Sequence, residues 1–157
     1  MNRRRFFVVS AGMTLAAGLV RERVASASSS SELVVVVNRE SGPTAISPLD
    51  LKRIFLTRMR RFDGGAVTEP ANLPFGTSER SLFDRSVLRM EPEEARLYWI
   101  DRKVRGGAPP PPRIPSPSLL LRHVAQHKGG IGYVTAGDVD DSVRIIARIR
   151  DGKVVSS

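Results

Sequence analysis

The fold of this chain is decided by two neighbouring stretches, LVVVVN at residues 33–38 and SPLDLKRIFL at residues 47–56. The first is a run of β-branched residues without polar alternation, which is typical of a strand buried on both faces. The second begins with helix-start chemistry, because Ser47 can cap the free amides and Pro48 suits the first helical position. A buried strand followed by a helix that packs back on it indicates an α/β sandwich.

The remaining sequence continues with segments of both kinds. We expect strands at 66–73, 131–134, 143–149 and 153–155, and helices that begin near Thr77 or Ser78, at Pro92 and after Ser116. Because polar and apolar residues alternate over 143–149, that strand is predicted to be half-exposed and to lie at an edge of the sheet. The prolines of 109–112 predict an extended loop over the surface. The fold class is therefore α/β, a three-layer sandwich with a mixed sheet of about five strands.

The first residues read as an export signal and not as part of the fold. Arg3, Arg4 and Arg5 precede an apolar run at 6–20, which is too short to span a bilayer but suits a signal-peptide core. The small residues at 25–27 predict cleavage near Ala27. The order of arginines and phenylalanines is similar to a twin-arginine signal, and the general secretory route stays open as the alternative. After cleavage we expect no membrane-embedded segment.

Removing residues 1–27 changes the charge of the chain. That segment holds five Arg and one Glu, so its loss lowers the formal net charge from +9 to about +5. The chain has no cysteine, which leaves no disulfide and no lipid-anchored cysteine after the signal. We expect a serine-rich, disordered leader at 28–32 and one domain at 33–157, located in the periplasm.

Several functions are disfavoured by the residue pattern. The basic residues are scattered among acids and lack interleaved aromatics, so nucleic-acid binding is not expected. His123 and His127 are spaced for metal chelation, but no third ligand accompanies them, and a solvent-facing helical pair is the preferred interpretation. With no Gly-x-Ser-x-Gly elbow and no metal cluster, we predict neither an enzyme nor a cofactor.

The order of elements resembles one lobe of the type 2 periplasmic binding proteins, in particular the phosphate-binding-protein-like group of ABC importers. The matching pieces are Val-Asn at 37–38, Ile-Ser at 46–47, Ile-Phe-Leu at 54–56, Asp-Gly-Gly at 63–65, Gly-Thr-Ser-Glu-Arg at 76–80 with Phe83, and Gly-Ile-Gly-Tyr-Val at 130–134. The resemblance covers nearly all of residues 33–157. It implies a binding protein for phosphate or a similar oxyanion, with an ABC permease as partner.

The resemblance also implies where the anion would bind. In that family a Ser-Gly-Thr turn at a helix start meets the oxyanion, often with an arginine beside it. Here the turn aligns with Thr77, Ser78 and Glu79, and the arginine aligns with Arg80. Free amides and hydroxyls at a helix start are suitable donors to an anion. The predicted ligand-binding residues are Gly76, which precedes the turn, Thr77, Ser78 and Arg80.

Two features of the sequence depart from the family pattern. Glu79 stands where a hydroxyl is expected, and Leu73 stands where the family has a further arginine. The chain also has residues for one lobe only, whereas full members clasp the ligand between two. These departures support the alternative hypothesis, a ligand-free lobe that serves as a periplasmic protein-interaction or sensory module.

Overall fold

The computed structural model describes residues 32–63 and 65–156, so the predicted export signal lies outside the described residues. Its central element is β1 (Leu33–Asn38), in which every residue is buried. This strand pairs with β3 (Gly130–Thr135) on one side and β4 (Val143–Arg150) on the other, antiparallel to both. The prediction of a strand buried on both faces is confirmed.

Five strands form one mixed sheet in the order β2-β3-β1-β4-β5. The strand β2 (Glu69–Pro70) is much shorter than the predicted 66–73 and pairs parallel to β3. The strand β5 (Lys153–Ser156) pairs antiparallel to β4. The α/β fold class and its mixed sheet of five strands are as predicted.

The prediction that the strand at 143–149 lies at an edge is wrong. In the structure β5 covers its outer side, so β4 is an interior strand. The two strands are joined by Asp151 and Gly152, both with positive φ, 49° and 71°. A turn of this kind matches the twist of a hairpin and returns the chain directly alongside the preceding strand. The alternating pattern reflects one partly exposed face and says nothing about which strand lies outermost.

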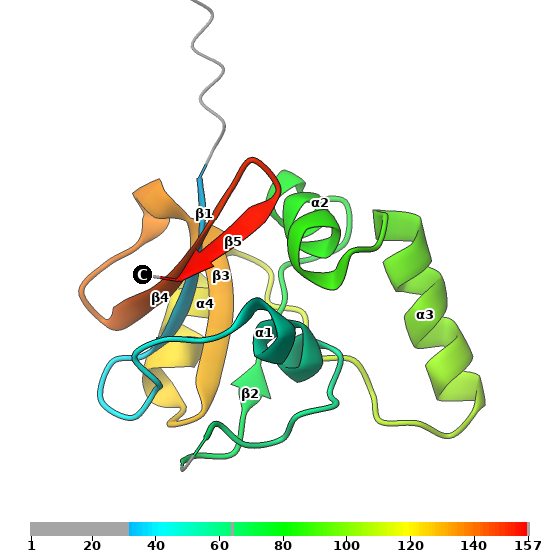
Figure 1. Ribbon diagram of the computed structural model, residues 1–157, viewed down its shortest axis with the longest axis horizontal. Helices are drawn as coiled ribbons and strands as arrows, with labels where there is room; N and C mark the ends of the chain where they lie inside the picture. The colour runs from blue at the N-terminus through cyan, green and yellow to red at the C-terminus, as the bar shows by residue number, and fades with distance from the viewer. Residues whose placement is uncertain (1–31, 64, 157) are drawn as a thin grey trace, which may run out of the picture.

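Helices cover both faces of the sheet (Figure 1). The helix α4 (Pro117–Gln126) packs on β1, β3 and β4 from one face. On the other face lie α1 (Pro48–Phe55) and α2 (Ser78–Phe83). The helix α3 (Pro92–Val104) lies outside α2, on the side of the molecule away from β4 and β5.

The helix starts follow the chemistry that the sequence predicted. Ser47 and Ser116 each cap their helix by accepting a hydrogen bond from the amide three residues on, and a proline follows each cap. In α1 the buried residues are Leu51, Ile54 and Phe55, which share one helical face. Local capping and apolar spacing therefore fix both the start of α1 and its buried side.

The segment after α2 is a π-helical turn, η1 (Asp84–Leu88), which ends at Arg89 with a left-handed φ of 59°. Turns of this kind occur often at functional sites, because the widened backbone displaces side chains from regular helical positions. Four of the five residues of η1 are buried, including Asp84 and Ser86. The turn thus carries polar side chains into the interior beneath α3.

An aromatic cluster joins the helices to the sheet. The ring of Phe83 in α2 stacks on Tyr133 in β3, with centroids 3.9 Å apart, and lies 4.6 Å from the ring of Phe55 in α1. Aromatic pairs of this kind add stabilisation beyond the apolar area that they bury. The cluster fixes the end of α2 relative to β3 and to the end of α1.

Gly129, just before β3, is packed too tightly for any side chain. A Cβ atom there would lie 1.6 Å from the backbone oxygen of Val67, which cannot move without breaking the pairing beside β2. By contrast, a Cβ atom on Gly137, in the 3₁₀ turn η2 (Ala136–Asp138), would meet nothing within 4 Å.

We expect Gly129→Ala to lower the free energy of unfolding by about 3 kcal/mol or more, because the added methyl overpacks two backbone segments. Gly137→Ala is the matched control and should change it by less than about 0.5 kcal/mol. Urea denaturation followed by circular dichroism measures both. Equal stability of the two variants would contradict the packing described here.

Candidate functional site

The four residues predicted to bind an anion lie together at the start of α2. Gly76 has a positive φ of 92°, and Thr77 caps the helix by accepting from the amide of Arg80 at 3.3 Å. The Thr77 hydroxyl also donates to the oxygen of Pro74, and the Ser78 hydroxyl donates to Glu79. The hydroxyls are therefore engaged in shaping the turn, and Arg80 is the member whose side chain enters the interior.

The Arg80 guanidinium is buried, with 1% of the residue exposed. Its Nε donates to both carboxylate oxygens of Asp84, at 2.8 and 3.0 Å. On its other side it lies over the ring of Phe75, 4.3 Å from the centroid. Burial raises the pKa of Asp84, and the charge of Arg80 opposes that rise. A hydrogen bond with Arg80 also opposes the rise in the pKa of Tyr133, so the terminal amino groups of Arg80 are in part engaged within the protein.

The position of β3 relative to this arginine is held by a buried tyrosine. The Tyr133 hydroxyl donates to the side-chain oxygen of Asn72 at 3.2 Å and accepts from the amide of Leu73 at 3.3 Å. Burial strongly raises the pKa of Tyr133, so its hydroxyl stays protonated at every physiological pH, although Arg80 opposes the rise. The Tyr133 hydroxyl therefore has a structural role as a hydrogen-bonding group and does not act as an acid or a base.

Arg80 forms one wall of a cavity of about 200 Å³ between α2, α3 and the proline segment. The lining residues are polar or basic on one part and apolar on the other: Asn72, Arg80, Arg96, Lys103 and Arg113, with Phe75, Trp99, Ile100, Pro110 and Pro111. Four of the ten carry a positive charge and none is a carboxylate. The composition of the wall favours a negatively charged occupant.

The helix α3 supplies four of these residues from a single face. Arg96, Trp99, Ile100 and Lys103 are spaced i, i+3, i+4 and i+7, which brings them into line along a helix. The sequence predicts a helix that begins at Pro92, and on the spacing of its apolar residues Trp99 is expected to pack in the core. The signal that was missed is two basic residues on the same helical face as the tryptophan.

The proline segment forms the opposite wall and is anchored to the end of β2. The amide of Asn72 donates to the oxygen of Pro112 at 2.9 Å, and the amide of Ile114 donates back to the oxygen of Asn72 at 2.7 Å. Prolines restrict the backbone, so these two bonds suffice to hold the segment in place. Arg113, between them in sequence, is thereby fixed beside the cavity, with its guanidinium 5.9 Å from the ring centre of Phe75. The predicted surface loop is thus also a wall of the site.

The charges around the cavity are only partly neutralised. Arg80 is paired with Asp84, and Arg96 is paired with Glu93 at the surface, with 2.5 Å between nitrogen and oxygen. Lys103 and Arg113 form no ion pair with any residue in the described ranges. Two unpaired cations therefore border the cavity.

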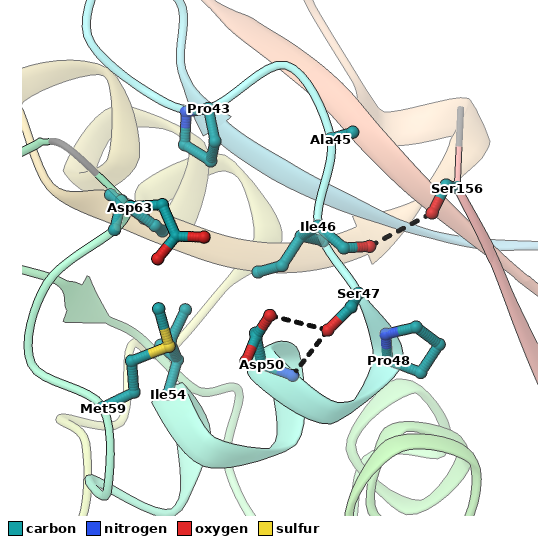
Figure 2. A pocket seen from close by; sticks show the side chains of 11 residues that line it. Pro43, Ala45, Ile46, Ser47, Pro48, Asp50, Ile54, Met59, Asp63 and Ser156 are labelled. Carbon is teal, nitrogen blue, oxygen red and sulfur yellow. Dashed lines mark hydrogen bonds between the residues drawn. The ribbon is translucent and has the colours of Figure 1, made fainter.

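A larger pocket, of about 490 Å³, lies at the start of α1 and is unsuited to an anion (Figure 2). Ser47 donates to the carboxylate of Asp50 at 2.7 Å, and the carboxylate of Asp63 points toward Ile46. Of the residues that the structure describes, no lysine or arginine lines this pocket. Its two carboxylates would repel an anionic ligand, so the smaller, basic cavity is the better candidate site.

The two histidines are half-buried: the His127 side chain is 38% exposed, as a solvent-facing pair requires, whereas His123 is turned further inward. Their rings stack with centroids 4.1 Å apart, and His127 Nδ1 donates to the backbone oxygen of His123 at 2.7 Å. His127 Nε2 lies 3.8 Å from a carboxylate oxygen of Glu69, and His123 Nε2 is buried with no hydrogen-bond partner in the described part of the chain. Over the ranges that the structure covers, no three His, Asp or Glu side chains gather closely enough to hold a metal ion.

Comparison with solved structures supports the resemblance in fold. An ABC-type phosphate transport receptor from Vibrio cholerae is similar with a TM-score of 0.57 at 16% identity. A protein from Clostridium perfringens, described as a phosphate ABC transporter substrate-binding protein and solved with bound phosphate, gives 0.58 at 17%. PstS from Borrelia burgdorferi gives 0.53 at 17%.

These similarities cover 72% of this chain and 43–45% of each solved structure. The chain therefore spans less than half the length of the proteins that it resembles, in agreement with the one-lobe resemblance predicted from the sequence. At such identities the likeness establishes the fold alone. No family model and no characterised protein matches the sequence. Within residues 32–63 and 65–156, no helix is long and apolar enough to cross a membrane.

We expect Arg80→Met to lower the free energy of unfolding by about 3–5 kcal/mol, because it leaves the buried Asp84 carboxylate without a counterion. Adding Asp84→Leu should recover most of that loss. Arg85→Met is the matched control: its partner Glu91 is 2.9 Å away, but both side chains are more than half exposed. Arg85→Met should lower the free energy of unfolding by less than about 1 kcal/mol. Equal losses for Arg80→Met and Arg85→Met in urea denaturation would contradict a buried pair.

The stability of the protein should fall as the pH drops below about 6.5, the ordinary pKa of histidine. Burial lowers the pKa of His123 in the folded protein, and the charge of His127 lowers it further, against an opposing effect of Glu69. The unfolded chain then binds a proton more readily than the folded one, so acid favours unfolding. Thermal melts at several pH values should show a shallower acid-side loss for His123→Gln than for the parent. Parallel curves would refute a lowered pKa at His123.

Proposed function

We propose that this protein is an exported solute-binding-type protein that binds phosphate or a related oxyanion in connection with an ABC importer. The observation that carries the proposal is the cavity beside Arg80, whose wall holds four cationic side chains and no carboxylate. The similarity in fold to structures described as phosphate transport proteins supports the same ligand class. The chain is a binding protein in this proposal and not an enzyme.

In this proposal Arg80 is the central anion contact. Its Nε is held by Asp84, so the planar terminal groups can present parallel donors to two oxygens of one anion. Lys103 and Arg113 add positive charge at the rim, where both are exposed to solvent. Gly76, Thr77 and Ser78 contribute by shaping the turn that leads into α2, and the free amides of its first turn favour negative charge nearby.

The proposed affinity is modest. The rim cations are exposed, so their attraction for an anion is screened by salt and competes with water. In proteins that clasp a ligand between two lobes, closure removes that water. A partner protein such as an ABC permease would complete the site here. This account agrees with the expected periplasmic location after cleavage near Ala27.

A thermal melt in the presence of phosphate, sulfate or molybdate tests the proposal. Ligand at one hundred times its dissociation constant should add about 2.7 kcal/mol to the free energy of unfolding. We expect a rise in melting temperature with millimolar anion in the parent protein at low ionic strength. The double variant Lys103→Gln with Arg113→Gln should bind at least tenfold more weakly, because it removes both unpaired cations.

The control variant is Arg122→Gln with Lys128→Gln, which removes the same charge from exposed positions outside the cavity. It should keep the parent's response to the anion. Equal weakening in both double variants would mean that general charge, and not this cavity, attracts the anion. If no anion raises the melting temperature, the oxyanion proposal fails and the alternative, a protein-interaction or sensory module, gains support.

A further inference from the structure

We propose that the cavity beside Arg80 takes an organic anion, in which a phosphate or carboxylate group is attached to a flat apolar ring. The inference rests on the proposed function, since it concerns the same anion site. It goes beyond that function by naming a ligand class that an inorganic oxyanion does not satisfy. Two features of the cavity point to it: its size and the apolar part of its wall, which adjoins the cations.

The cavity is larger than an inorganic oxyanion needs. Its volume is about 200 Å³, whereas roughly 10–15 Å³ on the same measure holds one water molecule. A phosphate or sulfate ion has the bulk of only a few waters. Most of the cavity would then remain filled with water, and the apolar part of its wall would gain nothing from binding. A ligand with a ring attached to the anion fills both parts.

Half of the wall is apolar and adjoins the cations directly. Phe75, Trp99, Ile100, Pro110 and Pro111 are the apolar lining residues. Phe75 carries the Arg80 guanidinium 4.3 Å from its ring centre and the Arg113 guanidinium 5.9 Å from it. Cationic and apolar surfaces therefore meet at a single aromatic ring. A ligand that contacts both surfaces needs a charged group attached directly to an apolar body.

The indole of Trp99 belongs to the apolar wall of the cavity. The residue is 94% buried, since 6% of it is exposed, so its position in the wall is fixed by packing. Its ring offers a flat apolar surface on which the ring of an organic anion would pack.

Ile100 identifies the part of the wall that would contact the ring. It lies one residue after Trp99 on α3 and is 47% exposed, which is high for an isoleucine. A ring placed between Ile100 and Phe75 would cover exposed apolar area from both. Burial of apolar surface stabilises by about 25 cal/mol per Å². An aryl anion thereby gains affinity that inorganic phosphate cannot obtain from the same cations.

The test uses the intrinsic fluorescence of Trp99, which is the one tryptophan in the chain. The purified protein is titrated with phenyl phosphate, benzoate, inorganic phosphate and phenol at low ionic strength. We expect phenyl phosphate or benzoate to bind at least tenfold more tightly than inorganic phosphate and than phenol. If phenyl phosphate binds more tightly than benzoate, the ligand type is a phosphate ester. If benzoate binds more tightly, the ligand type is a carboxylate.

A matched pair of variants locates the apolar contribution. Ile100→Ser should weaken phenyl phosphate or benzoate binding several-fold and leave inorganic phosphate unchanged. Leu119→Ser is the control, because Leu119 is similarly exposed at 42% but lies on α4, away from the cavity. It should change neither affinity. Equal effects of the two variants would overturn the assignment of Ile100 to the ring site.

The outcomes separate this inference from the function on which it rests. If inorganic phosphate binds as tightly as the aryl anions, the inference is overturned while the oxyanion function stands. If phenol binds as tightly as phenyl phosphate, the cavity is an apolar pocket and the organic-anion inference is overturned. If no anion changes the fluorescence or the melting temperature, the proposed function and this inference both fail.

Discussion

The structure depends first on the burial of β1 on both faces. Its residues have no polar side chain until Asn38, so the strand must be covered from above and below and paired on both edges. That requirement accounts for helices on both faces of the sheet and for the interior position of β4. The outer elements are not needed to cover β1, so α3 and the segment that follows β2 can form a cavity at the surface.

The buried pair of Arg80 and Asp84 connects this core to the cavity. Removing a guanidinium and a carboxylate from water is costly, and the pair alone does not repay the cost unless further groups satisfy its remaining donors. Here Asp84 engages only Nε, and Phe75 covers one face of the guanidinium. Arg80 is also one of the residues that line the cavity. In the proposed site an anion would satisfy donors of this arginine that an apolar core would leave unused.

Local chemistry predicted the fold better than it predicted the site. The caps at Ser47 and Ser116 and the apolar run at 33–37 depend on residues near in sequence, so they could be read directly. The interior position of β4 depends on which strands pair, and no alternation pattern contains that information. Arg80 was identified through the helix start. Arg113 could not be placed, because the bonds between Asn72 and the proline segment bring together residues about forty positions apart.

The way in which such a cavity can bind a ligand depends on how much of the ligand stays in contact with water. A charged ligand that remains in contact with water gains little from surface cations, since each interaction is exchanged for one with solvent. Apolar contact suffers less from this exchange, because its free energy arises from the removal of water itself. An open cavity of this kind therefore obtains selectivity more readily from the apolar wall of Phe75, Trp99 and Ile100 than from charge alone. In the proposed site the arginines and the lysine would attract and orient an anion, and the ring-lined wall would discriminate among different anions.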